Sequence, residues 1–201
     1  MPDWHVVPNL TERRHRQTRA DIAEAAIRLF RDAGFDAVTM DDVAVAAGIS
    51  RRTVYRHFPS KDDLVFEHPR SWLQHFDEVT VENTTESGVE RCLRALRSIA
   101  RLIDETAESV HAAYDVYVQT PSLRGTYGRL DDESFARFYA LAVPDLPDDD
   151  NRIVDAAIVA GVLVGTLNGV IAAWVLRWPD LSMVDAMEHG LERVSPILVG
   201  R

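Results

Sequence analysis

The sequence predicts an all-helical protein with a small N-terminal helical domain followed by a larger helical domain. Apolar residues recur at steps of three and four through nearly every segment of the 201-residue chain, and no segment shows the strict alternation of a strand. Charge separates the two parts. Residues 1–61 hold ten Arg and Lys against eight Asp and Glu, a net +2, and the remainder holds twelve against twenty-four, a net −12. The basic end therefore suits a polyanion, which the acidic remainder would repel.

The first helix is expected over residues 16–33, where one apolar stripe runs at helical spacing. Gly34 follows it at a position that favours a left-handed C-cap. A second, short helix begins after Thr39, a natural N-cap, and Asp42 falls at its third position, as in a capping box. This helix ends at Gly48, where we expect a tight turn.

A third helix is expected from Ser50, its N-cap, to about His57, because Pro59 cannot continue it. Ser60 then caps a fourth helix. The succession of helix, turn and short helix predicts a helix-turn-helix arrangement. Its expected core residues are Phe30, Phe35, Val38, Val43, Ala46, Ile49, Val54 and Phe58.

The later segments are also helical, interrupted at TPSLRG and VPDLPDDD. Apolar residues at helical spacing mark residues 88–103, 105–118, 131–142, 151–178 and 182–198. The single cysteine, Cys92, excludes an intramolecular disulfide and zinc sites built on cysteine pairs. The seven histidines are scattered, and no hydrolase, P-loop or dinucleotide motif occurs. We therefore expect no enzyme activity, no cofactor and no metal.

The third helix carries an unusual mixture of side chains on the face opposite Val54 and Phe58. That face holds Ser50, Arg51, Arg52, Thr53, Tyr55, Arg56 and His57. A charged helix face is most often only a solvated surface. Here, however, no acid occurs between Asp42 and Asp62, and hydroxyls and aromatic rings stand between guanidinium groups. Because arginine suits guanine edges and Thr, Tyr and His suit phosphate oxygens, this face is predicted to bind DNA.

The stretch GFDAVTMDDVAVAAGISRRTVYRHFPSKDDL, residues 34–64, resembles the DNA-binding domain of the TetR family of bacterial transcription regulators. The resemblance is ungapped there and extends over about residues 16–76. It implies a flexible basic arm over residues 1–15 and a helix-turn-helix domain over residues 16–61. It further implies a ligand-binding and dimerisation domain over residues 62–201. A chain with one cysteine fits the reducing cytoplasm, where we expect this protein.

The resemblance also implies roles for individual residues. Arg51 and Arg52 occupy two variable positions that often reach bases in the family. Positions that commonly contact phosphates hold Thr39, Ser50, Thr53, Tyr55, His57 and Lys61. The arginines of the lead-in either belong to a frayed terminus or lie along the minor groove, which attracts arginine. They are Arg13, Arg14, Arg16 and Arg19.

Residues 156–176 contain no charge, and their length alone would allow a membrane span. We reject that interpretation because the segment stands alone, acidic regions flank it and no signal peptide opens the chain. A helix apolar on all sides also suits burial from two directions. The resemblance implies both directions, a ligand-domain core and a two-fold partner, which together with residues 182–198 make a four-helix bundle. The expected dimer-interface residues are Gly161, Gly165, Gly169, Met187 and Leu191.

Aromatic and polar residues on inward helix faces form a candidate effector pocket, although each could equally be plain core. They are Trp72, Phe76, Leu96, Ile99, Tyr114, Tyr117, Phe138 and Asn168, with His111 as a further polar anchor. The expected effector is a small, mostly apolar molecule that releases a repressor homodimer from a palindromic operator. The alternative is an architectural DNA-binding dimer without a ligand, and a cavity within residues 62–178 would distinguish the two.

Overall fold

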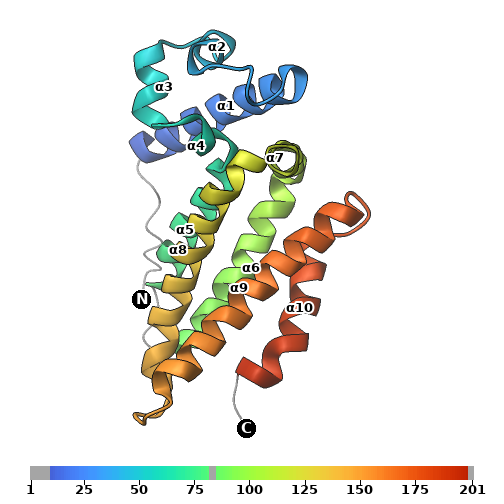
Figure 1. Cartoon of the computed structure of the whole chain (residues 1–201). Coiled ribbons are helices and arrows are strands. Elements are labelled where there is room, and N and C mark those ends of the chain that lie inside the picture. The colour runs from blue at the N-terminus through green and yellow to red at the C-terminus, as the bar shows by residue number, and fades with distance from the viewer. Residues whose placement is uncertain (1–9, 82–84, 199–201) are drawn as a thin grey trace. The chain divides into compact units, whose positions relative to one another are not determined.

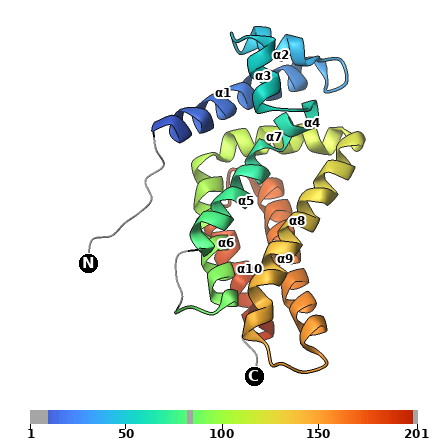
Figure 2. The ribbon, with the colours of Figure 1, turned by 90° about the vertical axis from the view of Figure 1, so that its left-hand side faces the viewer.

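The computed structural model describes residues 10–81 and 85–198, which are helical with short connections and contain no strand. The predicted all-helical class is confirmed. The helices group into two compact units (Figures 1 and 2). One unit comprises residues 1–67 and 112–121, and the other comprises residues 68–111 and 122–201.

The first unit holds four helices and the end of a fifth. They are α1 (Leu10–Ala33), α2 (Met40–Ala46), α3 (Arg51–His57), α4 (Lys61–Val65) and the second half of α7 (Ala107–Gln119). The helix ends follow the local sequence as predicted. Thr39 and Asp42 form a capping box at α2, and the Ser50 hydroxyl accepts a hydrogen bond from the backbone N–H of Thr53 at α3. Ser60 forms a second capping box with Asp63 at α4.

The core of the first unit fixes the orientation of α3. Val54 and Phe58 are completely buried, and α3 packs on α2, which in turn packs on α1. Six of the eight expected core residues are buried; Ala46 is exposed and Ile49 is half-buried. The helical register places Ala46 on the outer side of α2, next to the exposed Val45. The opposite face of α3 is thereby left to solvent.

Two glycines allow the turns that the sequence predicts. Gly34 has a φ of 87° and Gly48 a φ of 67°. Both values lie in the left-handed region, where a residue with a side chain would have a strained backbone. Gly34 ends α1 and Gly48 makes the turn between α2 and α3, so these two residues set the course of the helix-turn-helix.

The structure differs from the expected arm and domain boundary. Helix α1 begins at Leu10, so residues 10–15 of the expected flexible arm are helical, while residues 1–9 lie outside the described residues. The first unit reaches Glu67, beyond the expected limit at Lys61, because α4 packs on α1. It also includes residues 112–121, where the Tyr117 ring meets the Phe66 ring at 5.8 Å.

The second unit is a helical bundle. It contains α5 (Glu67–Thr80) apart from Glu67, α6 (Gly88–Glu105), the start of α7, η1 (Pro121–Leu123) from Ser122, α8 (Arg124–Ala142), η2 (Val143–Asp145), α9 (Arg152–Arg177) and α10 (Met183–Leu198). Both α6 and α9 pack against α8 and α10 (Figure 1). Helix α8 begins seven residues before the expected start at residue 131, because the TPSLRG break is only a short 3₁₀ turn that runs directly into it.

His68 makes the stability of the second unit dependent on pH. Its ring stacks on Trp72, and its Nε2 lies 3.0 Å from the Ser109 hydroxyl. Burial lowers the pKa of His68 from 6.5 to about 4. Between pH 6.5 and pH 4, His68 is protonated in the unfolded chain but stays neutral in the folded chain. The folded state is therefore fully stabilised above pH 6.5 and loses stability as the pH falls through this range.

We expect the free energy of unfolding to drop by about 3 kcal/mol between pH 6.5 and pH 4 through this residue. Chemical denaturation of the wild type and of His68→Gln over this pH range measures the effect, and the variant should show a flatter profile. His189→Gln, at an exposed position, is the control. Identical profiles for His68→Gln and the wild type would contradict the assignment.

Candidate nucleic-acid interface

The outer face of α3 presents three arginines and a tyrosine. Arg51, Arg52, Tyr55 and Arg56 are exposed, whereas Val54 on the opposite side is completely buried. The helix is only seven residues long, and its two ends are fixed by the Ser50 cap and by the buried Phe58. A short helix held on its inner side, with cationic and aromatic side chains outside, has the geometry of a helix that enters the major groove.

The two arginines expected to read bases have different surroundings. Arg51 Nε lies 2.9 Å from Asp41 Oδ1, Arg51 Nη1 donates to Asp41 Oδ2 at 3.0 Å, and the guanidinium carbon stands 5.4 Å from the centre of the Tyr55 ring. Arg52 is exposed and makes no polar or ring contact within the described part of the chain. Arg51 is therefore oriented before any DNA is bound, whereas Arg52 is free to adapt.

The expected phosphate-binding hydroxyls are partly occupied by helix capping. Thr39 Oγ1 donates to Asp42 Oδ2 at 2.6 Å and accepts from the Asp42 backbone, so its one proton is already used. The hydrogen bonds that the Thr39 hydroxyl and the Thr39 backbone N–H donate to the Asp42 carboxylate lower the pKa of Asp42. The Ser50 and Thr53 hydroxyls share one hydrogen bond of 2.8 Å, which leaves one of their two protons for a phosphate.

Two residues expected to contact phosphates, His57 and Lys61, are engaged with other parts of the unit, and their phosphate contacts stay predictions. His57 is 5% exposed, and burial, followed by the charges of His15, Arg56 and Arg19, lowers its pKa. The ring is packed against His15, with centroids 4.5 Å apart, so His57 offers no exposed cation. Its side chain is part of the packing between α1 and α3.

Lys61 is also engaged inside the unit. Its Nζ donates to the Phe35 carbonyl at 2.6 Å and to the Val38 carbonyl at 3.0 Å, and it lies 4.2 Å from the centre of the Phe35 ring. The ammonium group thus ties the start of α4 to the loop between α1 and α2. The partners lie 26 and 23 residues away, and no local sequence pattern indicates them.

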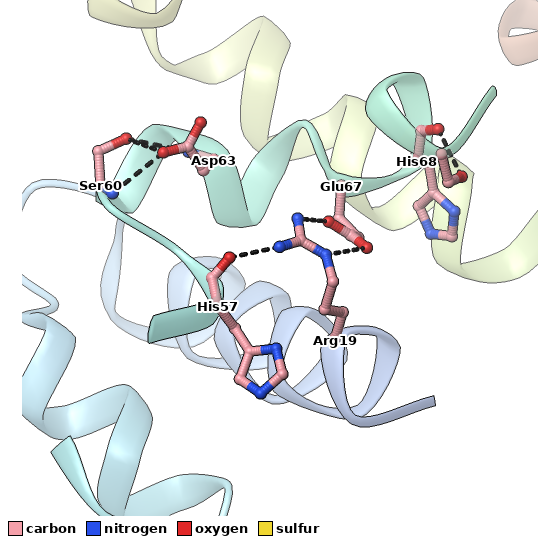
Figure 3. Close-up of polar contacts among 7 residues, drawn as sticks. Arg19, His57, Ser60, Asp63, Glu67 and His68 are labelled. Atoms are coloured by element: carbon pink, nitrogen blue, oxygen red, sulfur yellow. Dashed lines mark hydrogen bonds and ion pairs between the residues drawn. The ribbon is translucent and has the colours of Figure 1, made fainter. Parts of the chain in front are cut away.

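Arg19 holds the C-terminal end of α3 (Figure 3). Its guanidinium donates to the His57 carbonyl and to both carboxylate oxygens of Glu67, with Nε 2.9 Å from Oε1, and stacks 4.2 Å from the centre of the Phe58 ring. The side chains of Arg19 and Glu67 are only 21% and 13% exposed. Arg19 therefore supports the C-terminal end of α3 and is not available to a DNA groove. Its partner Glu67 is a structural residue that sequence reasoning missed.

The residues proposed for an effector pocket divide between the two units. Trp72, Phe76, Leu96, Ile99, Phe138 and Asn168 belong to the second unit, where all but Asn168 are buried. Tyr114 and Tyr117 belong to the first unit and contact each other edge to face at 5.7 Å. His111 stacks on Trp178 at 4.6 Å in the second unit.

Asn168 is the centre of a polar cluster that sequence reasoning missed. The Tyr127 hydroxyl donates to Asn168 Oδ1 at 2.9 Å, and Asn168 Nδ2 donates to Asp131 Oδ1 at 3.2 Å. Burial raises the pKa of Asp131. The three side chains join α8 to α9, and their spacing along the chain of about forty residues conceals the cluster in the sequence.

The residues expected at the dimer interface differ in their exposure to solvent. Gly161, Gly165 and Gly169 form an exposed line on α9, and a Cβ added at any of them would meet no atom within 4 Å. Met187 and Leu191 of α10 are 0% and 2% exposed, which corrects their assignment to the dimer surface. They fill the core of the second unit, where α10 packs on α6 and α9.

A sequence model described as "Bacterial regulatory proteins, tetR family" matches residues 22–67, which span the helix-turn-helix and end at Glu67. Residues 22–67 are therefore similar to the DNA-binding domain of TetR-family regulators. MftR of Mycobacterium tuberculosis, named as a mycofactocin biosynthesis transcriptional regulator, is 32% identical over 113 residues, which are 56% of this chain and 57% of MftR. TcmR of Streptomyces glaucescens is 28% identical, covering 95% of this chain and 88% of TcmR.

Solved structures show the same fold. FadR of Bacillus subtilis, in complex with stearoyl-CoA, superposes with a TM-score of 0.62 at 13% identity, covering 88% of this chain and 97% of FadR. These relatives are transcriptional regulators and not enzymes. Among the described residues, no group of three or more His, Cys, Asp or Glu side chains is arranged to hold a metal.

Proposed function

We propose that the chain is a homodimeric transcription regulator that binds a palindromic operator and is released by a small, mostly apolar effector. The observation that carries this proposal is the face of α3, where Arg51, Arg52, Tyr55 and Arg56 are exposed on a helix whose other side is buried. Arg52 and Arg51 read guanine edges, and Ser50, Thr53 and Tyr55 contact phosphates. Two copies of α3, about 34–36 Å apart, enter successive major grooves.

The line of glycines on α9 supports a dimer. Val154 and Ile158 on the same helix are 56% and 50% exposed, so apolar side chains accompany Gly161 and Gly165 on the surface of a single chain. Small residues in such a line let a second helix approach closely. Because a two-fold interface buries the same surface on both copies, α9 of a second copy is the proposed occupant.

The composition of α9 also admits a different reading. Helix α9 is long and apolar enough to cross a membrane by length and composition, and 33% of its most apolar window is buried inside the chain. Arg152 and Arg177 lie at its two ends, and Asp155 lies in its first turn. The similarity to TetR-family regulators and the packing of α9 on α8 and α10 favour a partner helix over lipid, in a cytoplasmic protein.

Gly165→Leu is expected to disrupt dimerisation. A Cβ added at this exposed glycine meets no atom within 4 Å, so we expect the substitution to leave the fold intact and to obstruct only a partner. Analytical ultracentrifugation should show a shift from dimer to monomer, and an unchanged far-UV circular dichroism spectrum should show that the helices are retained. Gly128→Leu, at an exposed glycine of α8 with equally open space, is the control. If the Gly165→Leu variant remained a dimer, the interface would not lie on the glycine line of α9.

The second unit provides the proposed effector site. Its core combines the aromatic pair Phe76 and Phe138, 5.1 Å apart, with the polar Asn168 cluster on neighbouring helices. Apolar walls with a few polar groups are typical of small-molecule sites. The solved FadR structure contains stearoyl-CoA, whose long acyl chain is apolar, and this supports an effector with a large apolar part. Release follows if the effector binds better to a conformation whose recognition helices are spaced unsuitably for DNA.

A transcription assay tests the regulatory function. A promoter carrying a duplex that the protein selects in vitro should be repressed when the chain is present, and repression should disappear with Arg51→Ala/Arg52→Ala. The double variant keeps the fold because neither side chain is buried. Equal transcription with and without the wild-type chain would contradict repression.

A further inference from the structure

The ion pair between Asp41 of α2 and Arg51 of α3 crosses the helix-turn-helix on its exposed side. We propose that Asp41 determines sequence specificity by holding Arg51 in the orientation that reads one base pair of each half-site. The inference rests on the proposed function, because it assigns a residue to the same DNA-reading surface. It adds an acidic residue to a surface that sequence reasoning described only by its cations, hydroxyls and aromatic rings.

The contacts restrain Arg51 from two sides. Nε and Nη1 face the two carboxylate oxygens of Asp41 at 2.9 and 3.0 Å, and the Tyr55 ring, one helical turn further along α3, lies 5.4 Å from the guanidinium carbon. A two-point contact fixes the plane of a guanidinium group as well as its position. Arginine has five N–H donors, and Asp41 accepts a hydrogen bond from one of them, so four remain for a base.

The ion pair has little to contribute to stability. The side chains of Arg51 and Asp41 are 66% and 54% exposed, and ion pairs this exposed add little to the stability of the fold. Capping of α2 does not require Asp41 either, because Asp42 supplies the carboxylate of the capping box. The position of Asp41 is therefore better explained by what it does to Arg51 than by what it does to the fold.

The charge of Asp41 acts on DNA in a second way. A carboxylate beside the recognition helix repels phosphates, so it weakens binding to any duplex that offers no favourable contact in compensation. A guanine that accepts two hydrogen bonds from the oriented Arg51 offsets this repulsion. Asp41 thus increases the ratio of specific to non-specific binding through both effects, whereas Arg52, which lacks such a partner, gains neither.

The test compares Asp41→Asn with Asp36→Asn. Both variants remove one exposed negative charge from the same domain, but Asp36 makes no polar contact within the described residues. Each purified full-length protein selects duplexes from a random pool, and the base preference is then measured at every position by competition. Arg51→Ala and the Asp41→Asn/Arg51→Ala double variant complete a cycle, and thermal unfolding of each protein checks the fold.

Asp41→Asn should lose about tenfold discrimination at one base pair of each half-site, the same pair that Arg51→Ala affects. Its affinity for unselected duplexes should stay equal or rise, and the double variant should resemble Arg51→Ala. The proposal is overturned if Asp41→Asn keeps the wild-type preferences, behaves as Asp36→Asn does, or weakens binding evenly to all sequences. If the wild type itself selects no sequence, the proposed function fails instead.

Discussion

Arg19→Met should lower the free energy of unfolding of the first unit by about 3–5 kcal/mol, the largest single-residue effect that we expect. The substitution leaves Glu67 as a carboxylate that is only 13% exposed and has lost its cation. It also removes the donor to the His57 carbonyl, at the C-terminal end of α3, which then lacks its side-chain partner. The aliphatic part of Met retains much of the packing against Phe58, so the loss reports on charge and hydrogen bonding.

Urea denaturation of the full chain measures this effect, and two further variants make it specific. Arg28→Met removes an arginine of the same helix whose ion pair with Glu24 is 62% exposed on both sides, and it should cost less than about 1 kcal/mol. Arg19→Met/Glu67→Gln removes both charges and should recover part of the stability, because no unpaired buried charge remains. Equal losses in Arg19→Met and Arg28→Met would show that the contact is not a buried support.

Arg52→Ala should weaken binding to a selected operator by about 1–3 kcal/mol and relax the preference at one position of each half-site. The guanidinium of Arg52 is exposed at the first turn of α3 and is not engaged with any other described residue, so its donors are free for a base edge. The effect is measured by fluorescence anisotropy against the selected operator and its single-base variants, at several salt concentrations.

Arg31→Ala is the matched control, because it removes one exposed arginine from the last turn of α1. It should leave the sequence preference unchanged. A uniform loss of affinity in Arg52→Ala, with a smaller dependence on salt and no change in preference, would assign Arg52 to a phosphate instead.

The sequence predicted those features that depend on neighbouring residues. The capping box at Thr39, the N-cap at Ser60 and the turns at Gly34 and Gly48 each require only residues three or four positions apart. The amphipathic spacing likewise placed most helices to within a few residues. Local preference was sufficient there because helix caps and turns satisfy their own backbone groups.

Features that depend on distant partners were not predictable. Lys61 and His57 both have side chains that suit phosphates. In the fold, however, Lys61 donates to carbonyls of the loop before α2, and His57 packs against the ring of His15. Helical spacing shows that Met187 lies on an apolar face, but it cannot show whether that face meets its own chain or a second one. The packing of α10 on α6 and α9 decides this, and it buries Met187 within the chain.

Selection of duplexes from a random pool by the wild-type protein tests the central claim most directly. The account predicts an inverted repeat whose half-site centres lie about one helical turn apart, with a guanine preference in each half that disappears in Arg51→Ala/Arg52→Ala. Binding should also fall steeply with salt, since phosphate contacts supply much of the affinity. Recovery of no enriched sequence, or of one whose preferences survive in the double variant, would contradict the assignment of α3 as the DNA-reading helix.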